Sequence, residues 1–423
     1  MVQEKPTDQP IQKSSVRKQL LISASIISFL VLSTLAAVLY GSGYRFGFQK
    51  GEPKLSKTGL LHLTSTPTGA EVYIDGHLTT ATNNTINLTP GKYTIKISKD
   101  GYSDWQKDVE IQKEVVLSVD ALLLPKLPSL QSISTFGVKS VVADPSGTKL
   151  AFKIASNSAR RNGVYVFDMT TRSFPVLAGQ SSSTQLVDDT TDFFSKATLS
   201  WSPDGKQILA STSGAFSTPT YYLLNADGFN STPSDVTATL PSITDAWQTQ
   251  RLDKETARLK GLKPAISEFA HKNFRILSWS PDDNKIFYQA SASSQMPVFL
   301  KPRRIGNNLL YERRDLKKGA IYVYDIKEDI NTRIVDVIDQ ICTDGEENCA
   351  KPFIWFPDSE HLIYVHEKKI DLVEVDGSNM TTSYAGPFID RYVFPWPDGS
   401  KLVILTNLNS PSVSPTLYTI GLK

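Results

Sequence analysis

The sequence is short of the residues that most often carry catalysis and metal binding. Its 423 residues include two cysteines, five histidines and four methionines. Two cysteines are too few for a zinc ribbon or a disulfide framework. The glycine patterns of nucleotide-binding loops and the Gly-x-Ser-x-Gly motif of hydrolases do not occur. Lys and Arg number 45 against 43 Asp and Glu, so no global field favours a nucleic acid as partner.

The histidines form no metal-binding pattern. His361 and His366 lie five residues apart on an expected strand, where this spacing directs side chains to opposite faces. Two side chains that face apart cannot share one metal ion. We therefore predict no catalytic residue, no cofactor and no metal site.

Charged residues are absent from 20–40, and these 21 residues are long enough to cross a bilayer as a helix. We predict one retained transmembrane helix there. A cleaved signal peptide is the alternative, although its apolar region usually has only about 7–15 residues. Basic residues flank both ends, and the pair Arg17-Lys18 directly before the helix favours a cytoplasmic N-terminus. Residues 1–19 would then be a cytoplasmic tail, and the bulk of the chain would be extracytoplasmic.

Cys342 and Cys349 enclose a polar loop that contains an Asp-Gly turn signal. A turn would bring the two sulfur atoms together, and in an oxidising compartment they would form a disulfide. Two unrelated thiols are the alternative. A zinc site would need more ligands than this loop offers.

The segment that follows the apolar run divides into a linker and a small domain. Residues 41–58 are rich in glycine and lysine and predict a juxtamembrane linker. In 59–125, short alternating segments are separated by Pro-Gly and Asp-Gly turns, which predicts a small antiparallel β-sandwich.

The phrases Pro-Thr-Gly-Ala-Glu-Val-Tyr-Ile-Asp-Gly, Leu-Thr-Pro-Gly-Lys-Tyr and Asp-Gly-Tyr give this segment a specific resemblance to the PEGA domain. The matching residues are Pro67, Gly69, Ala70, Asp75, Gly76, Pro90, Gly91, Gly101 and Tyr102. Thr68 stands where the tetrapeptide that names the family has Glu. The resemblance implies an extracytoplasmic β module that attaches or spaces a protein at the cell envelope, and not an enzyme.

From residue 126 to the end, a turn phrase with the core Trp-Ser-Pro-Asp-Gly-Lys recurs before apolar strands. Internal repetition of this kind is typical of propellers and solenoids. Proline presets the turn, aspartate bonds back to the turn's backbone and glycine completes it, while tryptophan supplies apolar area between sheets. The repeat-turn residues are Pro145, Trp201, Pro203, Asp204, Gly205, Trp279, Pro281, Asp282, Trp355, Pro357, Asp358, Trp396, Pro397, Asp398 and Gly399.

Further hairpins between these phrases complete four strands per unit, which is the blade of a β-propeller. The phrase resembles the WD40-like repeat of TolB-type propellers, and 201–206 match it fully. At roughly 42 residues per blade, 126–423 predicts six blades, with seven as the alternative. The fold class is thus all-β apart from the membrane helix and an insertion at about 243–273. The spacing of the apolar residues in this insertion predicts two short helices, which either pack on the propeller or form a lid for a partner.

A basic cluster lies in 301–318, diluted by Glu312 and Asp315. It is either a solvated hairpin or a contact for an anionic partner such as lipid headgroups or wall polymer. Its members are Lys301, Arg303, Arg304, Arg313, Arg314, Lys317 and Lys318. Together these features predict a non-catalytic, membrane-tethered binding or scaffold protein of the envelope, with a protein or wall glycan as partner. A glycan-active lyase or glycosidase that uses the propeller funnel is the alternative.

Overall fold

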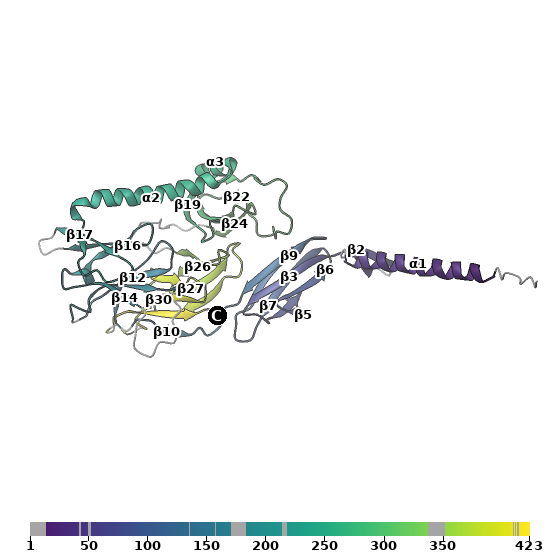
Figure 1. Ribbon diagram of the computed structural model, residues 1–423, viewed down its shortest axis with the longest axis horizontal. Coiled ribbons are helices and arrows are strands. Elements are labelled where there is room, and N and C mark those ends of the chain that lie inside the picture. The colour runs from purple at the N-terminus through teal and green to yellow at the C-terminus, as the bar shows by residue number, and fades with distance from the viewer. Residues whose placement is uncertain are drawn as a thin grey trace, which may run out of the picture.

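The computed structural model describes residues 14–41, 44–49, 52–134, 136–156, 158–170, 183–213, 218–336, 352–408, 410, 412 and 414–423. An N-terminal helix, a small β-sandwich and a β-propeller follow one another along the chain (Figure 1). The predicted all-β class with one apolar N-terminal helix is confirmed.

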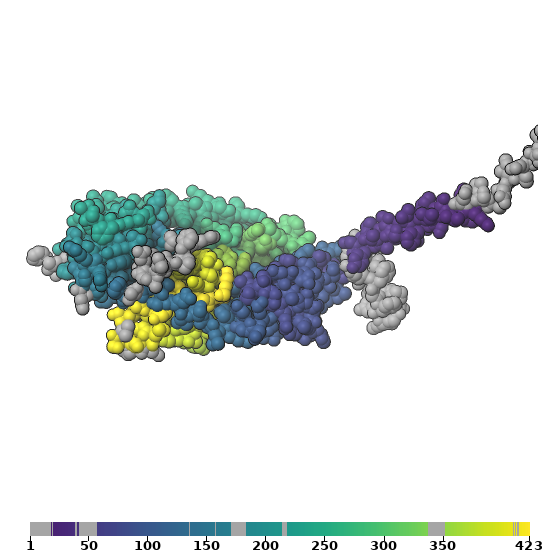
Figure 2. Space-filling model, turned by 60° about the horizontal axis from the view of Figure 1, so that its bottom comes forward, coloured from purple at the N-terminus to yellow at the C-terminus, as the bar shows by residue number. Residues whose placement is uncertain are grey.

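Helix α1 (Ser14–Gly41) projects away from the rest of the molecule (Figures 1 and 2). Within it, Leu20–Val38 form a stretch of 19 residues with a mean hydropathy of 2.3. This stretch is long and apolar enough to cross a membrane, and it coincides with the predicted transmembrane segment. None of it is buried against the protein.

The predicted linker contains regular structure that we did not expect. β1 (Tyr44–Gln49) and β2 (Glu52–Lys57) pair as an antiparallel hairpin, with Phe46 opposite Leu55. Aromatic residues alternate at positions 44, 46 and 48, which is the period of a strand. The high glycine and lysine content of 41–58 masks this signal in the sequence.

The small domain consists of two sheets packed face to face around a buried core that includes Leu61, Val72, Ile97 and Val109. One pairing differs from the predicted antiparallel sandwich, because β3 and β9 run parallel. The first sheet, in spatial order, contains β6 (Asn84–Leu88), β3 (Gly59–Thr66) and β9 (Val116–Leu122). The second contains β5 (His77–Ala81), β4 (Glu71–Ile74), β7 (Gly91–Ser98) and β8 (Trp105–Ile111).

The propeller consists of four-stranded antiparallel sheets, numbered here as blades 1 to 5. Blade 1 contains β11 (Val138–Ala143), β12 (Lys149–Ile154), β13 (Gly163–Asp168) and β14 (Ser183–Asp188). Blade 2 contains β15 (Thr198–Trp201), β16 (Gln207–Ser213), β17 (Pro219–Asn225) and β18 (Ser234–Asp235). Blade 3 contains β19 (Phe274–Trp279), β20 (Lys285–Ala290), β23 (Ile321–Asp325) and β24 (Ile330–Val335).

Blade 4 contains β25 (Phe353–Trp355), β26 (His361–His366), β27 (Lys369–Glu374) and β28 (Thr381–Ala385). Blade 5 contains β29 (Val393–Pro395), β30 (Lys401–Thr406), β31 (Thr416–Gly421) and β10 (Leu130–Ser132). The early strand β10 pairs with the last strand β31, so blade 5 joins both ends of the propeller segment. This pairing holds the first and last parts of the ring together.

The predicted number of six or seven blades is wrong for the described residues, which form five four-stranded propeller sheets. Two insertions account for the surplus residues. One contains α2 (Leu240–Gly261) and α3 (Pro264–Asn273) between blades 2 and 3. The other runs between β20 and β23 and contains the short pair β21 (Ser294–Gln295) and β22 (Asp315–Leu316). Together they hold more residues than one blade of about 42.

The helical insertion has the two helices that the sequence predicted, although the first is long. Pro264 begins α3, and α2 ends at Gly261. Ile266 and Leu262 are buried against blade 3, whereas Leu252 is exposed. Most of the apolar residues of the insertion therefore pack on the propeller itself.

Candidate functional site

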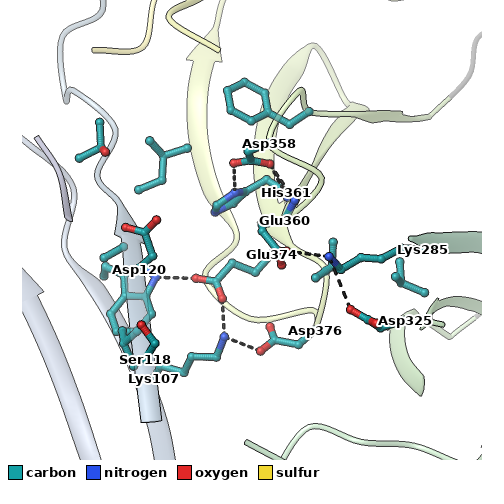
Figure 3. Close-up of a pocket in the computed structure, with 18 of the residues that line it drawn as sticks. Lys107, Ser118, Asp120, Lys285, Asp325, Asp358, Glu360, His361, Glu374 and Asp376 are labelled. Carbon is teal, nitrogen blue, oxygen red and sulfur yellow. Dashed lines mark hydrogen bonds and ion pairs between the residues drawn. The ribbon is translucent and has the colours of Figure 1, made fainter. Parts of the chain in front are cut away.

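The small domain is held against the propeller by strand β8, which we call the interdomain dock. Lys107 Nζ lies 2.5 Å from Glu374 Oε2 and 2.5 Å from Asp376 Oδ2, both at the end of blade 4. Trp105 donates its indole N–H to Glu374 Oε1 at 2.5 Å. The side chains of Lys107 and Glu374 are 16% and 10% exposed, so this charge network is shielded from water. Figure 3 shows Lys107 between its two carboxylates.

Burial alone would disfavour the charged form of Lys107. The carboxylates of Glu374 and Asp376 outweigh this effect and raise the pKa of Lys107 to about 12. The lysine is therefore an ammonium group throughout the physiological range. Its charge makes the dock a permanent ion-paired contact between the two domains.

Two further groups of contacts extend the dock. β8 is an edge strand, and the backbone N–H of Gln106 donates to Asn379 Oδ1 of blade 4 at 3.0 Å. From the insertion between β20 and β23, Asn308 donates to the carbonyl of Asp108 at 2.9 Å, and the Asp108 N–H donates to the Tyr311 hydroxyl at 3.2 Å. The edge of the sandwich is thus covered by blade 4 on one side and by the blade 3 insertion on the other, which pairs three of its backbone groups.

A cavity of about 740 Å³ lies between the domains beside the dock. Strands β8 and β9 line one side, and turns of blades 3, 4 and 5 line the other. Apolar side chains such as Val109, Leu117 and Val323 share its wall with charged groups. Figure 2 shows the sandwich packed against the propeller at this junction. Ligand sites are commonly found at such domain interfaces.

Several charged groups of the cavity wall bond to one another. Lys285 Nζ lies 2.6 Å from Glu360 Oε1 and 3.6 Å from Asp325 Oδ2. His361 Nδ1 lies 2.7 Å from Asp358 Oδ2 (Figure 3). Burial opposes the charge of His361, but the hydrogen bond to the Asp358 carboxylate outweighs it and raises the pKa of the imidazole. Within these pairs, the positive and negative charges largely neutralise each other.

The repeat-turn residues lie in the turns between the first and second strand of each blade, except that Trp201, Trp279 and Trp355 end the first strands. In 201–206, Asp204 accepts the Ser202 hydroxyl at 2.6 Å and the Lys206 N–H at 3.1 Å. Gly205 has a φ of 69°, in the left-handed region that suits glycine. Left-handed residues also lie at the matching place in the other four turns, at Gly147, Asp283, Ser359 and Gly399.

The same turns also bring neighbouring blades together. Trp201 donates its indole N–H to the carbonyl of Val142 in blade 1 at 3.0 Å. The N–H of Asp282 donates to the Ser359 hydroxyl in blade 4 at 3.2 Å. The repeated aspartates therefore have a structural role in these turns. His361 and His366 each bond to a different carboxylate, those of Asp358 and Asp371.

The basic cluster is partly folded onto the protein's own acids. Arg303 forms a two-point ion pair with Glu312 at 2.8 and 2.9 Å, and Arg314 lies 2.6 Å from the same carboxylate. Arg314 also reaches Asp329, and Arg304 reaches Glu328. Arg313 donates to backbone carbonyls. Lys301, Lys317 and Lys318 are exposed, so an anionic partner stays a prediction that rests on these lysines.

The remaining predicted residues fall into two groups. Cys342 and Cys349 lie outside the described residues, so the disulfide stays a prediction. The PEGA-motif residues lie in the sandwich: Ala70 is fully buried in its core and Tyr102 packs against it. Gly69, Asp75, Gly76 and Gly101 have positive φ in turns, and Pro90 and Gly91 lie where β6 leads into β7. Pro67 follows a cis peptide bond.

Sequence reasoning missed the residues of the dock. Lys107 and Glu374 are separated by 267 residues, and no local pattern links them. The sequence shows only a strand at 105–111 in which polar and apolar residues alternate, a pattern that any strand with one exposed face shares. The network forms only when the two domains pack against each other.

The fold and the site define a two-domain class of protein: a PEGA-type sandwich fused to a β-propeller behind an apolar helix. Residues 58–126 match the PEGA domain family, one residue beyond the predicted boundary at each end. The chain therefore contains a PEGA domain. No curated protein matches the chain.

Similar solved structures include a protein described as TolB from Agrobacterium tumefaciens, at 17% identity over 67% of this chain and 78% of that chain, with a TM-score of 0.22. TolB from Acinetobacter baumannii is 14% identical over 86% of this chain and 63% of that one, with a TM-score of 0.21. The β-propeller domain of Cps50 (Swd1) from Myceliophteria thermophila is 9% identical over 70% of this chain and all of that one, with a TM-score of 0.27.

Proposed function

We propose that this protein is a non-catalytic, membrane-tethered binding or scaffold protein of the cell envelope, whose propeller binds a protein or a wall glycan. The interdomain dock is the observation that carries the proposal. The network of Lys107 with Glu374 and Asp376 joins the two domains, and complementary charges across an interface fix its register. The dock therefore holds the propeller in one orientation relative to the PEGA domain.

Part of the propeller lies away from the PEGA domain. Successive turns of an antiparallel sheet alternate between its two ends. The turns of blades 3 to 5 that line the cavity face the PEGA domain, so the turn between the second and third strands of blade 4 lies at the other end. That turn contains Glu367 and Lys368, at φ of 45° and 60°. We assign partner binding to this end, because rigid strands hold its turns in place.

A glycan-active lyase or glycosidase is the alternative. Such an enzyme needs carboxylates or a histidine that can reach the substrate. The cavity does hold these residue types, but His361 bonds to Asp358, and Glu360 and Glu374 bond to lysines. Their mutual pairing supports a structural role and favours binding over catalysis.

Membrane placement forms part of the same proposal. We assign α1 to a retained anchor with its N-terminus in the cytoplasm, since Arg17 and Lys18 precede the apolar stretch directly. Protease treatment of intact spheroplasts should then degrade the propeller and spare only the helix and the N-terminal tail. A propeller that resists protease until the membrane is opened would contradict this orientation.

Site-specific photo-crosslinking in intact cells tests the binding surface. A photoreactive residue at Glu367, at the free end of blade 4, should capture an envelope protein or wall glycan. The same residue at Lys113, on the PEGA domain, is the matched control and should capture neither. Equal capture at both positions, or none at Glu367, would contradict the assigned surface. Release of sugar fragments from wall glycan by the full-length protein, lost in His361→Gln, would instead support the enzyme.

A further inference from the structure

Four of the five contacts between neighbouring blades share one kind of packing. Buried apolar clusters join blades 1 and 2, blades 3 and 4, blades 4 and 5, and blades 5 and 1. In each of them, side chains from two adjacent sheets form one continuous core. Contacts of this kind keep the blades of a propeller together.

The contact between blades 2 and 3 is different. Among the residues that the structure describes, no buried cluster contains side chains from both blades. The face of blade 2 that turns away from blade 1 packs against α2, and the face of blade 3 that turns away from blade 4 packs against α3 and Leu262. The helical insertion therefore stands between two sheet faces that pack directly on their neighbours elsewhere in the ring.

Helix α2, which we call the strap, connects the two sides (Figure 1). Trp247 is the buried residue of the strap, and it joins Leu209 and Val236 of blade 2. Residues 248–257 are exposed throughout, a helical stretch of about 15 Å. At the far end, Arg258 lies 2.7 Å from Asp283 and stacks over Trp279, and Leu259 packs against blade 3.

The two ends of the strap are held unequally. The cluster on blade 2 contains three buried residues, whereas the cluster that joins the insertion to blade 3 contains twelve. A polar contact adds little on the weak side, because Arg251 reaches the Trp201 carbonyl only at 3.4 Å. Local opening begins where few apolar groups are buried. The contact between the strap and blade 2 is thus the weakest joint of the ring.

We propose that the propeller ring opens at this joint: blade 2 separates from the strap, while α2 and α3 stay with blade 3 and the other four blade contacts remain closed. The opening is a conformational device of the propeller, independent of the partner proposed above. It uncovers the face of blade 2 that carries Leu209 and Tyr221.

Neighbouring residues on opposite faces of one strand provide the test. Leu209 faces the strap, whereas Ala210 faces blade 1 and Ile286 faces α3. Leu209→Cys, Ala210→Cys and Ile286→Cys are made separately in full-length protein whose native cysteines are replaced by serine, and the rate of thiol labelling is measured under native conditions. We expect Leu209→Cys to react about tenfold faster than the other two.

A second pair of variants separates opening of the joint from general instability. Trp247→Ala, which removes the anchor, should accelerate labelling at Leu209→Cys by about a further tenfold and leave Ala210→Cys and Ile286→Cys unchanged. Glu255→Pro, which breaks the exposed span without touching either end, should act in the same direction. Equal labelling at the three positions in the parent protein would overturn the proposal. So would acceleration at all three positions by either variant.

Discussion

The interdomain dock and the strap's anchor on blade 2 each join two parts of the protein, but they do so by opposite means. The dock relies on a buried lysine with two carboxylates and an indole hydrogen bond. The anchor relies on one tryptophan in a small apolar cluster. Complementary charges at short range fix the register of an interface, whereas an apolar side chain that moves into water loses only its share of buried area. The dock is therefore fixed, and the anchor can release.

The largest effect is expected when the dock loses its lysine. Lys107→Met leaves Glu374 and Asp376 buried without their cation, so the free energy of unfolding should fall by about 3–5 kcal/mol. Urea denaturation of the detergent-solubilised protein, followed by tryptophan fluorescence, measures the loss. Lys113→Met, an exposed lysine on the same domain, is the control. Equal stabilities of the two variants would show that the dock contributes no more than a surface charge.

Substitutions where the helical insertion packs on blade 3 should also lower the free energy of unfolding. Ile266 is 3% exposed in the core beneath α3, and Leu252 is 53% exposed on the strap. Ile266→Ala should lower the free energy of unfolding by about 2–5 kcal/mol because it leaves a cavity. Leu252→Ala should change it by no more than about 0.5 kcal/mol. Thermal denaturation of both variants compares them, and similar losses would mean that the exposed span has a packing role after all.

A smaller effect is expected when the dock loses its indole hydrogen bond but keeps its charged groups. Trp105→Phe keeps the aromatic ring but removes the N–H that Glu374 accepts, which should cost about 1–3 kcal/mol of unfolding free energy. Trp355→Phe is a matched control, because the Trp355 indole nitrogen is buried without a partner among the described residues. A control variant that loses as much as Trp105→Phe would assign the loss to ring packing.

The smallest effect concerns pH. The pKa of His361 is raised in the folded protein by Asp358, despite burial that acts the other way. Its contribution is therefore complete below the unfolded pKa of about 6.5 and is lost as the pH rises through the folded value. The free energy of unfolding should fall as the pH rises above about 6.5, and His361→Asn should flatten that part of the profile. An unchanged profile in the variant would assign the pH dependence to other groups.

Sequence patterns predicted the elements of the fold better than their assembly. The repeated turns around Pro203 and Pro281, the apolar helix and the PEGA motif are local features, and each has the form that its residues indicate. The blade count failed because chain length does not distinguish strands from insertions such as 240–273. The hairpin within 41–58 was not predicted, because its only signal in the sequence is an alternation of three aromatic residues.

For the candidate site, the local signals were incomplete in one case. Arg303 and Arg314 form part of a basic cluster in the sequence, which indicated either a solvated hairpin or a contact for an anionic partner. In the structure both arginines form ion pairs with Glu312. In the sequence, this residue only lowers the net positive charge of the cluster. Tyr311 from the same insertion lies against the PEGA domain. Net charge along a segment does not reveal which charges face each other after folding.

The sequence by itself determined the apolar helix, the sandwich and the propeller strands, because hydrophobic period and turn chemistry act over a few neighbouring residues. Only the tertiary structure decided that Lys107 meets Glu374 across 267 residues and that α2 stands between blades 2 and 3. Such contacts depend on which surfaces remain uncovered once each domain has folded. That outcome follows from the summed packing and desolvation of the whole chain, and no short segment encodes it.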